Sequence, residues 1–320
     1  MADILSPLLW IAGIVQTLLL VLAAPLFNGW IKCVKCWMQN RRAPSLLQPY
    51  RDLRRLFAKE IILAHRASVL FRIAPYVVLG TAMLAASTVP FITVRTPLAA
   101  VMDALVLVGT LALGRFFLSL AALDIGTAFG GMGASREMTL AALAEPAMLM
   151  VVFTMAMYAS STNLATVVSH VSSAPVALRP SLLFGLLALI LIGITETGRV
   201  PVDNPATHLE LTMVHEAMIL EYTGRHLALM ELASEIKLML YAVLVVNLFF
   251  PWGISNALAP GALAAGMLAV GVKLSLAGAL LAIAENLVAK MRLFRVPIFL
   301  AVAFTLAMIG MLSFIMLEGS

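Results

Sequence analysis

Long apolar runs dominate the sequence, and polar residues gather between them. Eight runs rich in Leu, Ala, Val and Met occupy residues 6–27, 69–93, 98–121, 139–160, 181–197, 227–250, 260–283 and 297–317. A helix that crosses a bilayer needs roughly 20 such residues. The runs do not alternate apolar and polar residues at every second position, as the strands of a membrane β-barrel would. The pattern therefore predicts an all-α polytopic membrane protein with a bundle of about eight transmembrane helices.

Composition supports the same class of protein. Hydrophobic residues make up 62% of the chain and charged residues only 12%, whereas a soluble domain is about half apolar and about a quarter charged. The connections between the runs are too short to hold a soluble domain. We therefore expect residues 1–320 to form a single integral membrane domain.

Lys and Arg are divided unevenly between the two sides of the predicted bundle. Apart from three basic residues inside the runs, nearly all of them fall in the first connection and in every second connection after it, and the other side holds only Arg95 and Arg179. Because Lys and Arg concentrate in short cytoplasmic loops, we expect residues 28–72 to be cytoplasmic and both termini to lie outside a cytoplasmic (inner) membrane. The net charge of +5 follows from this bias and does not indicate nucleic-acid binding.

The first predicted cytoplasmic connection contains an amphipathic segment. After Pro44 and Pro49, apolar residues recur at nearly helical spacing from Leu53 to Ile62, with basic residues between them. A helix of this kind can lie on anionic lipid headgroups or dock a cytoplasmic partner, and the two roles are compatible. The candidate docking residues in this connection are Arg41, Arg42, Arg51 and Asp52.

Acidic residues concentrate in residues 196–221, and others interrupt the apolar runs. Charge in a bilayer or at its edge is costly unless it is paired or hydrated, so such residues indicate function. Crowded carboxylates in a poorly solvated site cannot all ionise, and we expect them to share protons along a hydrated path. The alternative is a set of buried ion pairs that hold helices together, although such pairs alone contribute little stability. The candidate path residues are Glu145, Glu196, Asp203, Glu210, Glu216, Glu221, Glu231, Glu235, Lys237, Lys273 and Glu285.

The second predicted cytoplasmic connection is rich in glycine between Gly126 and Gly133. No Gly-Lys-Ser/Thr follows, so it is not a phosphate-binding loop. Ser135 is suited to cap the N-terminus of the fourth predicted helix. The functional alternative is an irregular backbone that lines a cavity at the membrane edge, where such backbone is tolerated.

The sequence does not predict a metal site. Cys33 and Cys36 cannot by themselves complete a four-ligand zinc or iron–sulfur site; we interpret them as structurally silent thiols, with a redox dithiol as the alternative. On one helix, His208 and His215 would be about 10.5 Å apart, too far to share a metal ion. We interpret them instead as groups that change charge near neutral pH. We expect no catalytic residue and no metal ligand in this chain.

Short motifs along nearly the whole chain resemble those of one family of membrane subunits. They are RR-x-P-x-x-LQ-x-YRD from Arg41, FR-x-x-PY from Phe71, LD-x-G from Leu123, GASRE from Gly133, EP from Glu145, ET-x-R-x-P-x-D from Glu196, EY-x-G from Glu221 and EN from Glu285. The chain resembles the subunit 1 family of respiratory complex I and the corresponding subunit of energy-converting (group 4) membrane-bound [NiFe] hydrogenases, including formate hydrogenlyase complexes. GASRE, YRD and THLELTMVHE resemble the hydrogenase branch more.

The resemblance implies a subunit that joins a cytoplasmic redox arm to the membrane. It implies partners of three kinds: an Fe–S small subunit, a hydrogenase large subunit and antiporter-like membrane subunits. Fe–S clusters and the NiFe centre would lie in those partners, and this chain would bind no cofactor of its own. Further candidate docking residues within the motifs are Arg136, Glu137 and Arg199.

Four functions are compatible with these observations. The first is an ion-translocating subunit of a hydrogenase complex, and the second is the quinone-site subunit of a complex I-like NADH:quinone oxidoreductase. The third is an independent secondary transporter, which should show inverted repeats and broken helices near the midplane; we find no such repeat in the sequence. The fourth is a purely structural anchor, which would not need acids within its spans.

Overall fold

The predicted helical bundle is present in the computed structural model, which describes residues 7–63, 67–95, 103–173, 179–203, 213–255 and 259–318. Seven helices in these ranges are long and apolar enough to cross a membrane, and a shorter apolar helix, α7, joins them. The long elements are α1 (Pro7–Met38), α3 (Val69–Thr88), α4 (Ala104–Asp124), α5 (Ala128–Ala159), α7 (Pro180–Glu196), α9 (Gly224–Phe249), α10 (Pro260–Leu287) and α11 (Val296–Ser313). The fold class predicted from the apolar runs is therefore confirmed.

Short helices connect or extend these spans. They are α2 (Gln48–Phe57), α6 (Leu164–Ser173), α8 (His215–Ile219), a 3₁₀ turn at Leu293–Arg295 and a π-helical turn at Phe314–Glu318. The hydrophobic pattern predicted α2 but not α6, which follows the fourth span in a stretch that we expected to be an external loop. No β-strand forms within the described residues; their only bridge pairs are two isolated ones.

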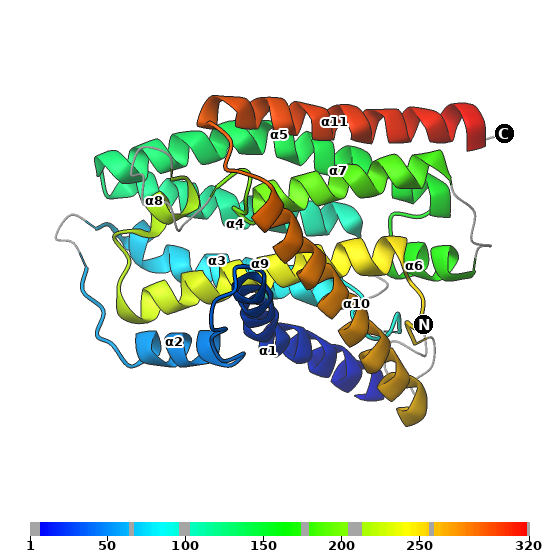
Figure 1. Ribbon diagram of the computed structural model, residues 1–320, viewed down its shortest axis with the longest axis horizontal. Coiled ribbons are helices and arrows are strands. Elements are labelled where there is room, and N and C mark those ends of the chain that lie inside the picture. The colour runs from blue at the N-terminus through cyan, green and yellow to red at the C-terminus, as the bar shows by residue number, and fades with distance from the viewer. Residues whose placement is uncertain are drawn as a thin grey trace.

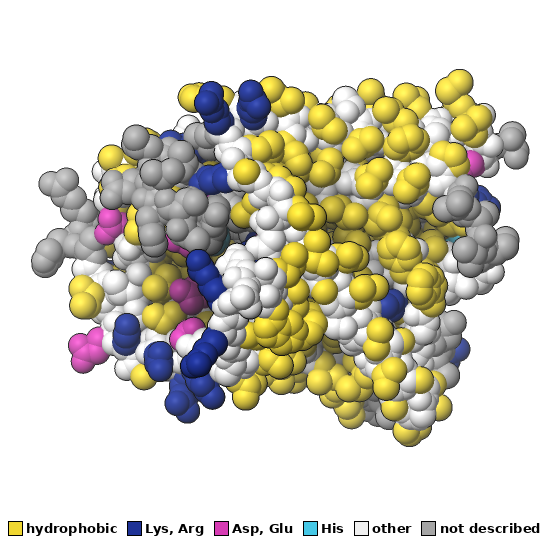
Figure 2. Space-filling model, in the orientation of Figure 1, with side chains coloured by type: hydrophobic (Ala, Val, Ile, Leu, Met, Phe, Trp, Pro, Cys, Tyr) yellow, Lys and Arg dark blue, Asp and Glu magenta, His cyan; other side chains and the backbone are white. Residues whose placement is uncertain are grey.

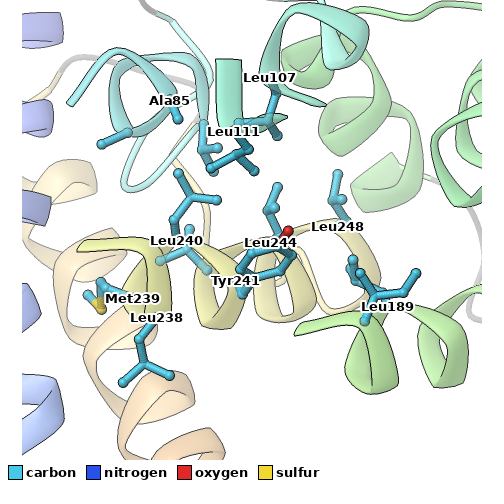
Figure 3. Close-up of a cluster of buried hydrophobic side chains, with 14 of the residues drawn as sticks. Ala85, Leu107, Leu111, Leu189, Leu238, Met239, Leu240, Tyr241, Leu244 and Leu248 are labelled. Carbon is cyan, nitrogen blue, oxygen red and sulfur yellow. The ribbon is translucent and has the colours of Figure 1, made fainter. Parts of the chain in front are cut away.

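The bundle has a regular part and a crossing pair. Helices α3, α5, α7, α9 and α11 run nearly along the long axis, while α1 and α10 are inclined to it (Figure 1). Helix α10 packs on α1 and α9, and α11 packs on α5 and α7. Leucines of α4, α7 and α9, including Leu111, Leu189, Leu240 and Leu244, converge in the buried centre (Figure 3).

Charge gathers at one end of the molecule. Figure 2 shows Lys, Arg, Asp and Glu side chains towards the left end of the visible face, and mostly apolar side chains over the rest. Helices α1, α7 and α10 end, and α9 begins, at this polar end (Figure 1). The distribution agrees with the uneven division of basic residues in the sequence.

The glycine-rich connection is helical, which corrects one of our predictions. Helix α5 already begins at Ala128, and its N-cap is Thr127, whose side-chain oxygen accepts a hydrogen bond from the Gly130 N–H at 3.3 Å. Ser135 therefore lies inside α5 and is not the cap. A Cβ atom on Gly133 would stand 3.0 Å from Met218. Gly130 and Gly133 thus permit close packing of α5, and the glycines from Gly130 onward lie within the helix and do not form an irregular lining.

The amphipathic helix is present but shorter than the apolar pattern indicated. Helix α2 buries Pro49 and Leu53 and ends at Phe57, so the predicted apolar face does not extend to Ile62. The N–H of Ile62 instead donates to Thr223 Oγ1 at 2.9 Å, and the Thr223 hydroxyl donates to the Ile62 carbonyl at 2.9 Å. Next to this contact, Gly224 has a φ of +55°, and a Cβ there would lie 2.2 Å from the Glu60 carbonyl oxygen. Only glycine fits this approach between the chain after α2 and the start of α9.

Candidate functional site

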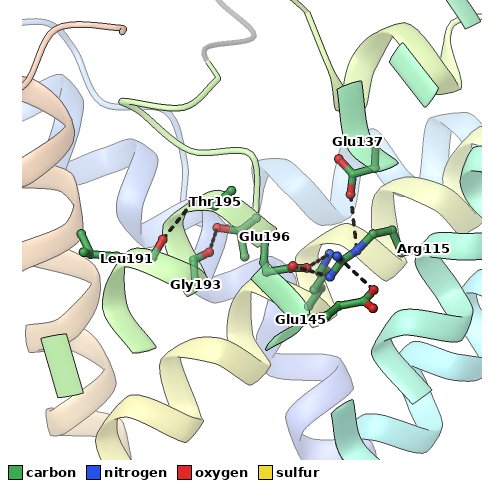
Figure 4. A network of polar contacts seen from close by, with 9 residues as sticks. Arg115, Glu137, Glu145, Leu191, Gly193, Thr195 and Glu196 are labelled. Carbon is green, nitrogen blue, oxygen red and sulfur yellow. Dashed lines mark hydrogen bonds and ion pairs between the residues drawn. The ribbon is translucent and has the colours of Figure 1, made fainter. Parts of the chain in front are cut away.

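A buried arginine contacts several carboxylates inside the bundle. Arg115 is in the apolar helix α4, where it is 6% exposed. Its Nε is 3.6 Å from Glu137 Oε1, and its Nη1 is 3.3 Å from Glu145 Oε1, both from α5. Its Nη2 donates to Glu196, the last residue of α7. Figure 4 shows the three carboxylates converging on the guanidinium.

Glu196 links this arginine to a second cation. Its side chain is 3% exposed, and its other oxygen lies 2.8 Å from Lys237 Nζ on α9. We call these five residues the Arg115 cluster: Arg115, Glu137, Glu145, Glu196 and Lys237. When every member is ionised, three carboxylates face two cations. The cluster therefore carries one carboxylate more than its two cations balance.

A small cavity adjoins the Arg115 cluster. Its volume is about 60 Å³, and its polar lining includes Arg115, Glu137, Glu196, His215 and Lys237. A water molecule needs roughly 10–15 Å³ of such space and two or more polar partners. The cavity can therefore hold a few waters in contact with the carboxylates of Glu137 and Glu196 and with both cations. This arrangement permits proton exchange between the cluster and water.

His215 is neutral in this environment at physiological pH. Burial lowers the pKa of His215 to about 4, and the positive charge of Lys237 acts in the same direction, with opposition from Asp203. The interpretation of His215 as a group that changes charge near neutral pH is therefore wrong. His208, the other histidine in that interpretation, lies outside the described residues.

We expect this histidine to make the protein sensitive to acid. Because the folded pKa lies below the ordinary value of 6.5, His215 stabilises the fold fully above pH 6.5 and loses that contribution as the pH falls towards 4. The loss should reach at most about 3 kcal/mol. Thermal unfolding of the purified protein and its His215→Gln variant would measure it. The two should diverge between pH 6.5 and pH 4, and parallel curves would contradict the assignment.

A second group of polar residues joins α1, α9 and α10. The Glu285 side chain is fully buried and pairs with Lys35 and with Arg199, whose Nη1 is 3.5 Å from Glu285 Oε1. Arg199 Nη2 donates to Asn28 Oδ1 at 2.9 Å, and Asn28 Nδ2 donates to Glu235 Oε1 at 2.8 Å. We call this group the Glu285 cluster: Asn28, Lys35, Arg199, Glu235 and Glu285.

The end of α7 connects the two clusters. Glu196 belongs to the Arg115 cluster, and Arg199, three residues later, belongs to the Glu285 cluster. Just beyond, Asp203 is 4% exposed, lies 3.3 Å from Lys290 Nζ and accepts a hydrogen bond from the Val214 N–H at 3.1 Å. The motif that starts at Glu196 therefore supplies a residue to each of three neighbouring ionic groups.

Other predicted path residues are not members of these two clusters as defined above. Glu221 is exposed, and Glu216 and Glu231 are partly buried. Glu210 is outside the described residues. Lys273 lies near the opposite end of α9, where its Nζ donates to the Phe250 carbonyl at 2.9 Å and to Asn247 Oδ1 at 3.3 Å. A cation at the C-terminus of a helix is favourable, so the position of Lys273 is that of a helix cap.

The predicted docking residues also fall into two groups. Arg41, Arg42 and Arg51 are exposed, and the partly buried Asp52 accepts a hydrogen bond from Gln48 Nε2 at 2.9 Å. In contrast, Arg136 donates to the Met213 carbonyl at 2.9 Å. Glu137 and Arg199 are members of the two internal clusters. Only the first group is available to a soluble partner through its side chains.

Sequence reasoning missed three members of the clusters as site residues: Arg115, Asn28 and Lys35. Arg115 carried a usable signal, because an arginine within an apolar run needs a buried partner.

Within the described residues, no group of three or more His, Cys, Asp and Glu side chains could hold a metal ion. The Cys33 thiol donates to the Pro44 carbonyl at 3.1 Å and thereby holds the loop after α1.

The chain is similar to subunits of formate hydrogenlyase, hydrogenase-4 and NADH-quinone oxidoreductase. It is 31% identical over 280 residues to formate hydrogenlyase subunit 4 of Escherichia coli (strain K12), covering 88% of this chain and 90% of that one. It is 32% identical over 285 residues to hydrogenase-4 component C of the same organism, covering 88% of each chain. NADH-quinone oxidoreductase subunit 8 of Rhodothermus marinus is 25% identical over 267 residues, which cover 76% of this chain and 74% of that one.

The fold has also been seen before. A chain of an archaeal respiratory membrane complex, the membrane-bound sulfane sulfur reductase, matches with a TM-score of 0.79 and 18% identity, covering 94% of this chain and 99% of that one. At this identity the match shows the fold alone. The family model described as NADH dehydrogenase matches residues 11–316. The chain therefore belongs to the NADH dehydrogenase family, the complex I subunit 1 family that its motifs resemble.

Proposed function

We propose that this chain is the membrane-anchoring subunit of a membrane-bound [NiFe] hydrogenase complex and couples a cytoplasmic redox arm to ion movement. Two relatives with hydrogenase names are 31% and 32% identical to it, and a quinone oxidoreductase subunit is 25% identical. This difference supports the hydrogenase branch. An inventory of the subunits that co-purify with the chain would test it, because a quinone-reducing arm in place of a NiFe-binding subunit would contradict the proposal.

The Arg115 cluster is the observation that carries the coupling role. It combines an excess carboxylate, two cations and a cavity large enough for a few waters in an otherwise apolar bundle. A change of charge in a neighbouring redox partner alters the electric potential at the cluster. Because one pKa unit corresponds to about 1.4 kcal/mol, a modest potential is enough to bind or release a proton there. The Glu285 cluster, joined through the end of α7, extends this charged region towards α1 and α10.

The polar end of the molecule is the proposed docking face. Its exposed Arg41, Arg42 and Arg51 offer positive charge to a partner that carries acidic groups. In this arrangement the partners are an Fe–S small subunit and a hydrogenase large subunit, which hold the Fe–S clusters and the NiFe centre. Antiporter-like subunits lie alongside in the membrane. The polar end faces the cytoplasm of an inner membrane, and both termini face outward, as the basic residues favour.

We expect charge reversal on this face to release the redox arm. Arg51→Glu places a negative charge in the most basic part of the docking face, so the fraction of the soluble arm that stays on membranes should fall at least about tenfold. The size of this loss should depend on ionic strength, because salt screens the charges of such an interface. Arg95→Glu is the matched control, because Arg95 is also exposed but lies on the opposite side. Sedimentation of membranes followed by assay of the arm would measure the effect. If the soluble arm stays fully bound to membranes in both Arg51→Glu and Arg42→Glu, the segment contacts lipid only and does not dock the arm.

A further inference from the structure

An apolar groove runs along the outside of the bundle between the two inclined helices. It has a volume of about 360 Å³ and is lined chiefly by one face of α1, from Leu19 to Trp30, and by one face of α10, from Met267 to Ser275. Met239 of α9 is part of its lining, and Leu46 from the loop after α1 adjoins it. The groove is separate from the cavity beside the Arg115 cluster, and the two share no lining residue.

The lining offers no hydrogen-bonding group to an occupant. Ser275 is its one polar side chain apart from the Trp30 indole, and the Ser275 hydroxyl donates to the Val272 carbonyl at 2.8 Å. The Trp30 Nε1–H donates to the Ser275 carbonyl at 2.9 Å. A ligand with a polar ring would lose its hydrogen bonds to water here and gain none. The chemistry of the groove therefore fits a plain hydrocarbon chain.

The length of the groove matches one leaflet of a bilayer. Leu19 and Trp30 are eleven residues apart on α1, which corresponds to about 16 Å of helix. The hydrocarbon core of a bilayer is about 30 Å thick, so one leaflet contributes about 15 Å. An acyl chain from the polar end of the protein would reach from the membrane interface to the midplane within this groove.

The polar end of the groove has the features of a headgroup site. Trp30 packs edge-to-face on the exposed Trp37, with ring centroids 5.6 Å apart, and tryptophan is enriched at the bilayer interface. The nearby loop, whose Leu46 lines the groove, presents the exposed Arg41 and Arg42. The Cys33–Pro44 hydrogen bond of 3.1 Å holds this loop against α1. The basic side chains are complementary to an anionic phosphate.

We propose that the groove holds one acyl chain of an anionic phospholipid, whose headgroup contacts Arg41 and Arg42 of the loop that adjoins the groove. The lipid fills the space between α1 and α10, the two helices that Lys35 and Glu285 join at the polar end. It is thereby a resident part of the membrane domain, distinct from the proton-carrying clusters. Lys35 is not part of the headgroup site because it is paired with Glu285.

Gly271 provides a direct test of the groove. It lines the groove, and a Cβ added to it would meet no atom within 4 Å. Gly271→Leu should therefore occupy the groove without disturbing the packing, and leucine also favours helix over glycine. Gly109→Leu is the matched control, because Gly109 is an exposed glycine of α4 whose Cβ would likewise meet nothing within 4 Å.

The probe is phosphatidylglycerol with brominated acyl chains, added to the delipidated complex in detergent. Quenching of Trp30 fluorescence, isolated by subtraction of the Trp30→Phe variant, should saturate at one lipid per chain in the parent and in Gly109→Leu, and should be absent in Gly271→Leu. Equal quenching in Gly271→Leu, or quenching that rises without saturation, would overturn the proposal. Recovery of one isoprenoid quinone per chain in place of phospholipid would overturn it as well.

A second arm tests the headgroup. Arg41→Gln and Arg42→Gln should each weaken phosphatidylglycerol binding about fivefold and leave the binding of brominated phosphatidylcholine unchanged. Equal affinity of the parent protein for the two lipids would contradict an anionic headgroup site. Gly271→Leu and Gly109→Leu alter neither the Arg115 cluster nor the docking face, so in these two variants hydrogenase-linked turnover can be followed separately from lipid binding.

Discussion

Replacing Arg115 with methionine should destabilise the folded chain by about 3–5 kcal/mol, because it removes one of the two cations that face the buried carboxylates of Glu137 and Glu196. Three glutamates contact this guanidinium, whereas the direct ion pair of Lys237 is with Glu196. Thermal unfolding of the purified protein in detergent would measure the loss. Arg115→Lys should lie between the parent and Arg115→Met, because it keeps the charge but not the fork of donors that reaches several carboxylates.

An exposed arginine supplies the control for this prediction. Arg54 is exposed on α2, and Arg54→Met should change stability by no more than about 0.5 kcal/mol. If Arg115→Met unfolds at the same temperature as the parent protein, the Arg115 cluster contributes nothing to the fold. The ion pairs described here would then be incidental to it.

Glu145→Gln should reduce coupled turnover of the assembled complex at least about tenfold, which is within the range of groups that transfer protons. The change preserves the shape of the side chain and leaves Arg115 paired with Glu137 and Glu196. Its main effect is to remove a carboxylate that can carry a proton. Assembly should therefore remain intact, and the measurement is turnover per assembled complex in sealed membranes. Normal turnover would instead favour a purely structural role for this carboxylate.

The sequence predicted the architecture well because the bilayer imposes strong constraints. Apolar length alone located the spans, and the basic residues indicated which end is polar. The boundaries were less accurate wherever small residues were involved. Helix α5 begins eleven residues before the predicted run because Thr127 caps it and its glycines pack against α4 and α8. The apolar pattern does not predict the part of a helix that continues beyond the hydrocarbon core, because that part need not be apolar.

The site was only partly predictable. Residue types and motifs singled out Glu145, Glu196 and Lys237, but not which cation joins them. Arg115 and Glu196 are 81 positions apart in sequence, and their contact depends on the packing of α4 near the end of α7. The same holds for Asn28 and Glu235, which are 207 positions apart. Charge alone also could not separate the buried Glu196 from the exposed Glu221, because both follow apolar segments and belong to similar motifs.

Proton movement by the reconstituted complex tests the central claim most directly. The complex would be placed in sealed vesicles with a pH-sensitive dye inside, and turnover and internal pH would be recorded together for the parent, Glu145→Gln and Glu221→Gln. Glu221 is exposed and lies apart from the Arg115 cluster, so the same substitution there is the matched control. We predict that the parent and Glu221→Gln form a pH gradient during turnover and that Glu145→Gln does not. A full gradient at the parental turnover rate in Glu145→Gln would contradict the proposal that the Arg115 cluster couples the redox arm to proton movement.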